Sequence, residues 1–367
     1  MRHAMRNTVW GLARWVLGAA VVVGAMTMSA RADWTVVNLH PAGATESYAN
    51  DIQGGQQVGC AYVDGVGRAS LWSGSAASWV DLNPTGATYS QATGVCNGQQ
   101  VGRVSTVGGA GHASLWSGTA ASWVDLLPGY QASAVYGGQQ VGYSYVGGRK
   151  QAGLWSGTAE SWVNLNPIGA TQSHCDGVYG GQQVGSATVG GVPHAGLWTG
   201  SAASWADIHP TAAAYSVAYD VYDGQQVGYA HVGGYDHAGL WSGTAESWVD
   251  LHPSGSAYLY SHAYGVYSGQ QVGEVMVSGA THAGLWSGSA DSWVDLHLFV
   301  PSDFTSSKAH GIWSDGVSTY VVGKGYSASA GRWEALMWIG PVPEPASGLA
   351  LATGLSAVAL LRRRRGR

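Results

Sequence analysis

The chain has 367 residues, including 57 glycines, 18 tryptophans, 19 tyrosines and only 2 phenylalanines, and 10% of its residues are charged. This profile excludes a helical enzyme and a disordered chain, and it favours a β-rich fold with frequent turns. The formal net charge is −5, but residues 33–361 carry seven basic against 21 acidic residues, so we expect no basic patch interleaved with aromatic residues and no nucleic-acid partner. The other nine basic residues lie in the two terminal segments: Arg2, Arg6, Arg14, Arg31, Arg362, Arg363, Arg364, Arg365 and Arg367.

The first 32 residues have the pattern of a secretory signal peptide. A positively charged region (residues 2–14) precedes a mostly apolar run (residues 15–28), and Ala30-Arg31-Ala32 is a small-x-small cleavage site. We therefore expect cleavage after Ala32 and export to the periplasm or the outside of the cell, where disulfides form. A retained membrane anchor is the alternative, and the shortness of the apolar run counts against it.

The rest of the chain repeats one phrase, clearest at residues 224–253, GQQVGYAHVGGYDHAGLWSGTAESWVDLHP. A period in the low forties, rich in glycine and aromatic residues, indicates propeller blades or a similar array. The GQQVG core begins at Gly55, Gly98, Gly138, Gly181, Gly224 and Gly269, and a weaker echo begins at Tyr320. A tryptophan ends the next segment of each copy, at Trp72, Trp116, Trp155, Trp198, Trp241, Trp286 and Trp338.

Each copy predicts four antiparallel strands. In the copy at residues 173–210, the expected strands are 173–179, 182–189, 194–198 and 205–208, and the turn between the first two is Gly180-Gly181. Its counterparts Asn97-Gly98, Asp223-Gly224 and Ser268-Gly269 favour type I′ hairpins, in which both central residues have positive φ. His209-Pro210 ends the fourth strand, because proline does not serve a central ladder position. We expect the interior glycine of QQVG to mark close approach of neighbouring sheets.

The two ends of the repeat array predict how the fold closes. The first segment after the signal peptide, WTVVNLHP (residues 34–41), matches a fourth strand, whereas the last copy ends at a third strand, EALMWIG (residues 334–340). We therefore predict a seven-bladed β-propeller in which the N-terminal strand completes the last blade. The seven first strands are expected near Ile52, Val95, Val135, Val178, Val221, Val266 and Ile312.

The pattern GQQVG...HAxLWSG...WVDL resembles the HAF repeats of extracellular bacterial proteins over about 300 residues. The theme of that family is a GQVVG segment, a His-Ala-Phe-Leu-Trp-like segment and a closing Asp-Leu. Here glycine or serine replaces the phenylalanine, as in His237-Ala238-Gly239. The resemblance implies secretion and a propeller-like array of sheets, and it implies no activity.

The C-terminal segment carries a tripartite pattern. Pro343-Glu344-Pro345 precedes an apolar run (residues 346–361), which is followed by Arg362, Arg363, Arg364 and Arg365. The run is barely long enough for a transmembrane helix, and the arginine cluster predicts that its C-terminus lies inside. The arrangement is similar to PEP-CTERM sorting signals, which implies an exosortase-type processing enzyme as a partner and passage through the inner membrane. Because the three features agree in order, they count against an ordinary tail anchor.

We expect no disulfide from Cys60, Cys96 and Cys175, since their number is odd and no CxxC spacing is present. We also expect no metal site and no cofactor. The repeated histidines occupy one place in different blades, so symmetry spreads them around a ring, and structural hydrogen bonding is their expected role. They are His112, His194, His237 and His282 at the third strand, and His40, His209, His252 and His297 at the end of the fourth.

Binding residues are better sought where the copies differ, early in the first strands beside the central channel. One slot holds Asn50, Asp176, Tyr219, Tyr264 and His310, and another slot, two residues earlier, holds Tyr48, His174, His262 and Lys308. These residues predict a shallow polar and aromatic site for a sugar or small ligand. A solvated channel without a specific ligand is the competing interpretation.

The expected organisation is a signal peptide (1–32), a seven-repeat propeller (33–340) and a sorting tail (341–367) with a transmembrane helix. We expect a non-enzymatic cell-surface or extracellular-matrix protein that serves binding or architecture, with extracellular polysaccharide as a candidate partner. It is membrane-anchored before its tail is processed. The alternative is a secreted propeller lyase or hydrolase acting on glycans at the channel mouth. Convergence of His174, Asp176, His262 and His310 would favour that enzyme.

Overall fold

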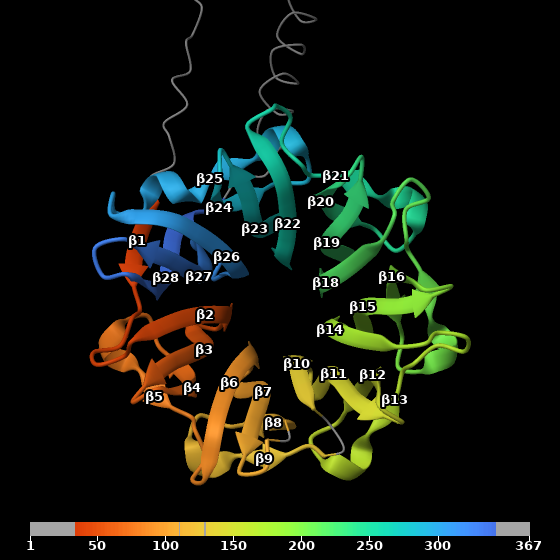
Figure 1. Ribbon diagram of the computed structural model, residues 1–367, viewed down its shortest axis with the longest axis horizontal. Coiled ribbons are helices and arrows are strands. Elements are labelled where there is room, and N and C mark those ends of the chain that lie inside the picture. Colours follow the sequence, from red (N-terminus) through yellow and green to blue (C-terminus); the bar gives the residue numbers. More distant parts are fainter. Residues whose placement is uncertain (1–33, 110, 128–129, 343–367) are drawn as a thin grey trace, which may run out of the picture. The chain divides into compact units, whose positions relative to one another are not determined.

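The repeated phrase folds seven times into the same four-stranded antiparallel sheet, and the seven sheets stand as blades around a central channel (Figure 1). The computed structural model describes residues 34–109, 111–127 and 130–342. All of these belong to one compact unit within Asp33–Arg367. The all-β, seven-bladed propeller predicted from the sequence is confirmed, and every expected first strand is present.

The strands of each blade run in order from the channel outward. Blade 1 is β2 (Glu46–Gln53), β3 (Gln56–Val63), β4 (Val66–Trp72) and β5 (Val80–Asp81). Blade 2 is β6 (Ala87–Cys96), β7 (Gln99–Thr106), β8 (Gly111–Trp116) and β9 (Val124–Asp125). Blade 3 is β10 (Gln131–Tyr136), β11 (Gln139–Val146), β12 (Arg149–Trp155) and β13 (Val163–Asn164). Blade 4 is β14 (Ser173–Tyr179), β15 (Gln182–Val189), β16 (Val192–Trp198) and β17 (Ala206–Asp207).

The remaining blades follow the same plan, and the last recruits the start of the chain. Blade 5 is β18 (Ser216–Tyr222), β19 (Gln225–Val232), β20 (Tyr235–Trp241) and β21 (Val249–Asp250). Blade 6 is β22 (Tyr258–Tyr267), β23 (Gln270–Val277), β24 (Ala280–Trp286) and β25 (Val294–Asp295). Blade 7 is β26 (Phe304–Ser314), β27 (Ser318–Ser327), β28 (Arg332–Pro341) and β1 (Thr35–Asn38).

Short 3-10 helices join the third and fourth strands, where the sequence suggested only a loop, and a seventh such helix follows β25. They are η1 (Ala76–Ser78), η2 (Ala120–Ser122), η3 (Ala159–Ser161), η4 (Ala202–Ser204), η5 (Ala245–Ser247), η6 (Ala290–Ser292) and η7 (Leu296–Phe299).

In blades 1 to 6 the turns between first and second strands have the predicted type I′ geometry, with positive φ at both central residues. In blade 2 these are Asn97 (φ 49°) and Gly98 (φ 77°), and in blade 4 Gly180 (φ 56°) and Gly181 (φ 83°). This conformation matches the twist of the flanking strands, so the turn chemistry fixes the register of each inner hairpin.

Strand β1 closes the ring. It pairs antiparallel with β28, with Thr35 opposite Ile339 and Asn38 opposite Leu336, and Figure 1 shows it at the edge of blade 7. The next residue, Leu39, donates its N–H to Ala335 O at 2.8 Å, as Leu82 does to Ala69 O at 2.8 Å in blade 1. The predicted closure by the N-terminal strand is therefore confirmed down to its register.

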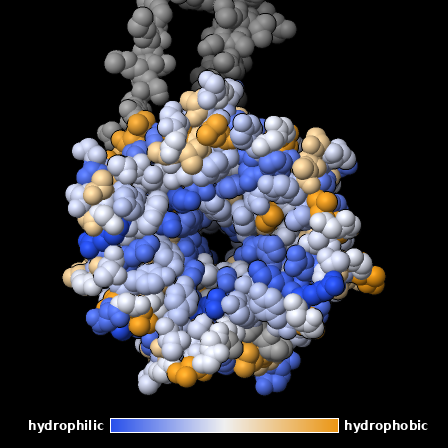
Figure 2. Space-filling model, in the orientation of Figure 1, coloured by the Kyte–Doolittle hydropathy of each residue, from blue (hydrophilic) through white to orange (hydrophobic). Residues whose placement is uncertain are grey.

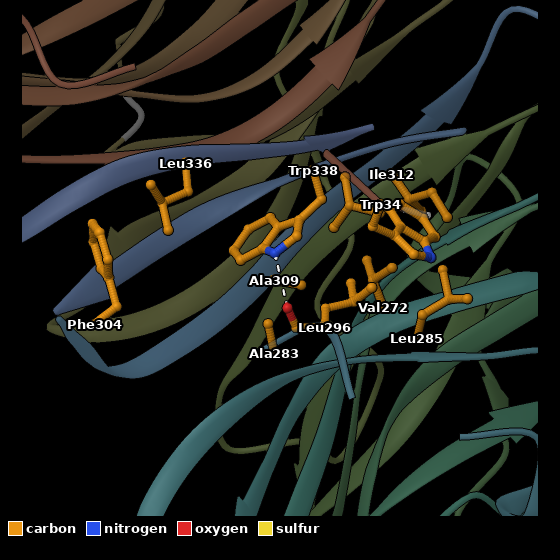
Figure 3. Packing of buried hydrophobic residues seen from close by; sticks show 11 residues of the cluster. Trp34, Val272, Ala283, Leu285, Leu296, Phe304, Ala309, Ile312, Leu336 and Trp338 are labelled. Atoms are coloured by element: carbon orange, nitrogen blue, oxygen red, sulfur yellow. Dashed lines mark hydrogen bonds between the residues drawn. The ribbon is translucent and has the colours of Figure 1, made fainter. Parts of the chain in front are cut away.

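One tryptophan per blade seals each interface between sheets. The seven residues that end the third strands are fully buried: Trp72, Trp116, Trp155, Trp198, Trp241, Trp286 and Trp338. Each packs against the preceding blade, as Trp116 does against Val58, Leu71 and Leu82. Burying about 150–250 Å² per ring contributes about 4–6 kcal/mol. Figure 3 shows Trp338 in the last interface, where its indole N–H donates to Leu296 O at 3.1 Å.

A second tryptophan explains why the residue at the x of HAxLW is small in blades 1 to 6. The ring that opens the fourth strand lies over the third strand at the x of HAxLW. A Cβ on Gly153 would lie within 1.6 Å of the Trp162 ring, and Ser70 in blade 1 instead accepts a hydrogen bond from Trp79 Nε1 at 2.9 Å. Blade 7 differs, because its residue at the x position is Leu336, and the ring of Trp34 lies instead over Gly340, further along the same strand.

The second glutamine of GQQVG has a structural role. Gln57 is buried, its side-chain N–H donates to Gly55 O at 2.9 Å, and its oxygen accepts from Gly74 N at 2.7 Å. The side chain therefore ties the inner turn to the loop that follows the third strand. The same bonds recur at Gln100, Gln140, Gln183, Gln226 and Gln271.

The interpretation of the interior QQVG glycine was wrong. A Cβ on Gly185 would lie 2.1 Å from His174 O, which belongs to the first strand of the same blade, not to a neighbouring sheet. The register of that strand shifts between Cys175 and Gly177, so the bulge presses the backbone against the glycine. Close approach between blades occurs instead at the bulge, where a Cβ on Gly177 would lie 2.8 Å from Asp220 Cα.

The repeated histidines make the structural hydrogen bonds that the sequence predicted. His194 Nδ1 lies 2.7 Å from Asp207 Oδ2 in the adjacent fourth strand, and His112, His237 and His282 make the same bond. His209 Nδ1 lies 2.8 Å from Ser216 Oγ in the next blade, and that hydroxyl accepts from Ala195 N. His40, His252 and His297 repeat this contact with the following inner strand.

Two sequence predictions fall outside the described residues, namely the signal peptide and the sorting tail with its transmembrane helix. Within the described ranges, no helix is long and apolar enough to cross a membrane. Cys60, Cys96 and Cys175 are buried and unpaired.

We expect Trp34→Ala to lower the free energy of unfolding by about 3–5 kcal/mol, because it leaves a cavity where β1 meets β28. Thermal unfolding measures the loss, and hydrogen exchange should show faster exchange at β1 and β28. Trp79→Ala is the control, since it removes a tryptophan that precedes the fourth strand in a blade of continuous chain. Equal exchange in blade 7 for both variants would contradict a sealing role for Trp34.

Candidate functional site at the channel mouth

We call the mouth face the side that carries the links from each blade to the next inner strand and the hairpins between second and third strands. The early residues of the inner strands lie at this face. Figure 2 shows a channel opening at the centre of the face drawn there, surrounded mainly by hydrophilic side chains. The variable residues singled out from the sequence therefore lie where a channel meets solvent.

The first variable slot forms a ring around one cavity of about 110 Å³. The structure brings together its five predicted members, and it adds Thr93 and Ser133, which occupy the same slot in blades 2 and 3. The predicted members are Asn50, Asp176, Tyr219, Tyr264 and His310. Asn50 and Thr93 are fixed by hydrogen bonds to Ala92 O and Ala132 O of the following blades, at 2.7 Å each.

His310 presents a hydrogen-bond acceptor to this cavity. Its Nδ1 lies 2.9 Å from Ala49 O, and a carbonyl accepts only from a protonated nitrogen. Burial lowers the pKa of His310 to about 4, although the bond to Ala49 opposes the shift. The ring is therefore neutral at pH 7, and Nε2 carries the free lone pair.

The second variable slot does not converge. Tyr48 lies under the ammonium of Lys324, 5.3 Å from Nζ to the ring centroid, whereas His174 turns to Asp176. His262 and Lys308 instead share Glu274, a residue that sequence reasoning missed. The repeat alignment tells only where a residue lies on its strand. It does not tell which side chains of neighbouring strands the residue contacts.

Glu274 is the centre of the strongest polar cluster at the mouth. It accepts from Tyr264 Oη at 2.7 Å and lies 2.8 Å from Lys308 Nζ and 3.2 Å from His262 Nδ1. Burial raises the pKa of this carboxyl, but His262, Lys308 and Tyr264 outweigh burial and lower the pKa to about 2. The carboxylate is therefore ionised at neutral pH and held by three partners.

His262 joins this cluster to a second carboxylate, Asp236. Its Nε2 lies 3.2 Å from Asp236 Oδ2, while His231 Nδ1 and Tyr215 Oη lie 2.7 and 2.9 Å from Oδ1. Burial raises the pKa of Asp236, but these three hydrogen bonds reverse the shift and lower the pKa. Blades 5 and 6 therefore form an ionised, hydrogen-bonded sector of the mouth.

His174 and Asp176 form a separate pair in blade 4, with Nε2 3.0 Å from Oδ2. Burial opposes protonation of the imidazole, but the charge of Asp176 outweighs burial and raises the pKa of His174. Beside it lies a cavity of about 220 Å³, lined by Lys150, Ser186 and Pro193 among others. In the described part of the chain, His262 and His310 make no hydrogen bond to this pair, so the four residues do not form one set.

The sequence missed a pair of carboxylates inside the channel. Asp51 and Asp220 occupy the bulge of the inner strands in blades 1 and 5, and both line the central cavities. Each carboxylate bridges to the next blade, as Asp220 does by accepting from Val221 N at 2.8 Å and Val266 N at 3.0 Å. Burial raises the pKa of Asp220 to about 7, and the charge of Asp51 adds to the shift.

A sequence signal for this pair exists. At the bulge the other five blades have glycine or alanine, namely Gly94, Ala134, Gly177, Gly265 and Gly311. Aspartate in a slot of small residues is as clear a break in the repeat as the slots that were chosen. The alternation of residues along a strand does not show a bulge, and it is the bulge that places Asp51 and Asp220 in the channel.

The opposite end of the channel is aromatic. Tyr136, Tyr179, Tyr222 and Tyr267 follow one another around it with ring centroids 4.4 Å apart at each step. They line a cavity of about 90 Å³ with Trp313 and the two channel aspartates. Across the described ranges, no three His, Cys, Asp or Glu side chains are arranged to hold a metal ion.

Comparison with known proteins gives a fold and no family. No family model and no curated protein matches the chain. Among solved structures, the β-propeller domain of the Trilobed protease from Pyrococcus furiosus has a TM-score of 0.54 at 9% identity, with 80% of this chain and 95% of that chain covered. That domain is described as having an open velcro topology, whereas β1 closes the ring here.

Two enzymes are also similar in fold. A puromycin hydrolase mutant (S511A) complexed with PGG has a TM-score of 0.52 at 11% identity, with 78% of this chain and 53% of that chain covered. The GH74 enzyme of Niastella koreensis has a TM-score of 0.50 at 13% identity, with 80% and 43% covered. This chain thus spans about half the length of the hydrolase. At these identities the likeness extends to the propeller fold alone.

The raised pKa of Asp220 predicts a pH dependence of stability. A carboxyl whose pKa rises from 3.8 unfolded to about 7 folded binds its proton more tightly in the folded state, so stability falls as pH rises through that window. We expect Asp220→Asn to lose less stability than the wild type between pH 4 and pH 8, measured by chemical denaturation. Asp223→Asn, in an exposed turn, is the control. Parallel pH profiles for wild type and Asp220→Asn would refute this assignment.

Proposed function

We propose that this chain is an exported, non-enzymatic propeller that binds extracellular polysaccharide on its mouth face. One observation carries the proposal: the side chains that break the repeat gather on this face and are mainly tyrosine, histidine and charged residues. Rings and fixed polar groups of this kind suit the mixed apolar and hydroxyl surface of a sugar chain.

The state of the mouth residues supports binding over chemistry. Glu274 and Asp236 are ionised and saturated with donors, and His310 is neutral with its Nδ1 engaged. General acid–base catalysis favours a group whose pKa lies near the working pH and which reaches the substrate. Rigid, satisfied groups instead favour recognition, because they lose little freedom when a ligand arrives.

The size of the channel also supports a surface site. Its cavities measure about 110 and 90 Å³, whereas small-molecule pockets usually enclose about 300–1,000 Å³. Such a channel holds several waters and no sugar ring. A polysaccharide would therefore lie across the mouth.

The compartment and the sorting route remain part of the proposal. The signal-peptide pattern supports export, and the Pro-Glu-Pro, apolar and arginine pattern supports processing by an exosortase-type enzyme. The chain would be anchored in the inner membrane by residues 346–361 before processing and released to the cell surface or matrix afterwards.

A glycan hydrolase or lyase is the second candidate, and the aspartate pair favours it. Asp51 and Asp220 lie in one cavity, and Asp220 has a pKa of about 7, as a general acid requires. Against this, both oxygens of each carboxylate already accept backbone N–H groups, and the cavity is narrow. Incubating the protein with the polysaccharides that it binds and measuring reducing ends or unsaturated products tests this alternative.

We expect the purified full-length chain to retain polysaccharides selectively on a glycan array. Tyr143→Ala on the mouth face should weaken that signal about tenfold, since burying or stacking a ligand against one aromatic ring contributes about 0.5–1.5 kcal/mol beyond the area that it buries. Tyr136→Ala at the other end of the channel is the matched control and should bind as the wild type does. A flat signal across all sugars would contradict the binding proposal.

Replacing Pro343, Glu344 and Pro345 by alanine should leave the chain in the membrane fraction of its native host. Alanine at Thr85, Ser254 and Ser256, which are exposed loop residues of the propeller, is the control for expression. Fractionation and immunoblotting measure the distribution. Release of the tail variant at the wild-type rate would rule out the sorting signal.

A further inference from the structure

The few basic residues of the propeller all lie toward the mouth face. Four are in third strands near their start, and the others are in the mouth-side halves of first or second strands. They are Arg68, Arg103, Arg149, Lys150, Lys308, Lys324 and Arg332. Toward the opposite face, the 3-10 helices and inner turns carry only acidic charges: Glu160, Glu246, Asp291, Asp223 and Asp315. The cations of the propeller are therefore confined to its mouth side.

Four of these cations have no carboxylate partner in the described residues: Arg103, Arg149, Lys150 and Lys324. All but Arg149 lie over an aromatic ring that defines the surface considered below. Arg103 lies 4.3 Å from the Tyr130 centroid, Lys150 lies 4.6 Å from that of Tyr143, and Lys324 is placed between two rings. By contrast, Arg68, Lys308 and Arg332 pair with carboxylates at 2.7 to 2.8 Å. Arg103, Lys150 and Lys324 thus have no carboxylate in direct contact among the described residues, although the charges of Glu46 and Glu274 act on Lys324 from further away.

Two of these cations, Arg103 and Lys324, are partly buried without a full set of polar partners. Arg103 Nε is buried and has no hydrogen-bond partner. Burial lowers the pKa of Lys324, and the nearby charge of Lys308 adds to the shift. A half-buried cation without an anion is costly, and an external anion would relieve the cost.

The rings connect these cations into one band across blades 7, 1, 2 and 3. Lys324 contacts Trp333 and Tyr48, and the Tyr48 hydroxyl interacts with that of Tyr89. Arg103 lies over Tyr130 and beside Tyr89, at 6.0 Å from the latter ring. Tyr130 stacks on Tyr143 at 5.6 Å, and Lys150 then leads to the cavity of about 220 Å³ beside His174. The aromatic residues are partly exposed, so the band is open to a ligand.

We propose that this band, defined by Arg103, Lys150, Lys324 and the rings between them, binds an acidic polysaccharide through its sugar carboxylates. The inference rests on the binding function proposed above and assigns its ligand class. Arginine and lysine pair with the carboxylates, and tyrosine hydroxyls bond to the sugar hydroxyls. The acidic sector around Asp176, Asp236 and Glu274 repels the same chain, so binding is confined to the band.

Single-stranded nucleic acid fits this band less well. Bases need free ring faces for stacking, whereas Tyr130, Tyr143 and Trp333 each have a cation over one face. Nucleic-acid binding at physiological salt also draws on about 6–10 phosphate contacts, whereas the described residues of this acidic body hold only four cations without a carboxylate partner. The band itself nevertheless overturns our expectation that no basic patch interleaved with aromatic residues exists.

Calorimetry of the full-length chain with polygalacturonate tests the proposal, with dextran as the neutral polysaccharide and poly(dT) as the nucleic acid. We expect binding to polygalacturonate that weakens with salt and no comparable binding to dextran or poly(dT). Lys150→Gln, Arg103→Gln and Lys324→Gln should each weaken it about three- to tenfold, and the triple variant should abolish it.

Arg149→Gln is the matched control, because it removes an adjacent charge whose guanidinium reaches only Thr171 O, at 3.5 Å. It should change affinity less than about twofold. An unchanged unfolding midpoint in each variant shows that the fold is intact. Dextran binding that equals polygalacturonate binding and ignores the substitutions would overturn this inference and leave the binding function standing. Binding of no polysaccharide would overturn both, and tighter binding of poly(dT) would replace the ligand class.

Discussion

The fold depends on the burial of one indole between every pair of adjacent sheets. Trp116 shows the arrangement: it ends a third strand and packs among the residues of the preceding blade, with no exposed surface. Everything around it serves that contact. Glycine or serine two residues before makes room for the fourth-strand tryptophan, and a buried glutamine holds the loop that follows. Because each interface needs the same contact, the sequence repeats the same phrase, and selection for stability leaves little freedom in it.

This constraint separates the molecule into residues that build blades and residues that are free to differ. The histidines that looked like candidate ligands belong to the first group, since His194 bonds to Asp207 and His209 bonds to the next blade. The second group is confined to the early inner strands and the mouth-side hairpins. There, blades 4 to 6 carry a carboxylate and histidine sector, and blades 7 and 1 to 3 carry the cations. A repeated scaffold thus presents an asymmetric face.

The fold was predictable because its determinants are local or periodic. Asn97-Gly98 specifies its hairpin, and the mismatch between residues 34–41 and 334–340 specifies closure. The site was predictable only in part. The position of His310 on its inner strand could be read from the repeat, and this position was enough to predict that His310 lines the channel. Glu274, Asp51 and the band of cations were missed, because their partners come from other strands and blades, where a sequence pattern records no distance. The prediction for the QQVG glycine was wrong for a related reason, because the bulge that contacts this glycine cannot be recognised in the alternation of residues.

Closure by β1 has a consequence for the order of events during synthesis. The partner of Thr35–Asn38 is Arg332–Pro341, so the first strand made has to wait for the last one. Until then, blade 7 lacks an outer strand, and β1 has no ladder to join. The ring therefore closes only once nearly the entire propeller has left the ribosome. If the chain is exported as proposed, this delay would keep the unfinished propeller open for threading through a translocation channel and would couple final folding to arrival on the far side.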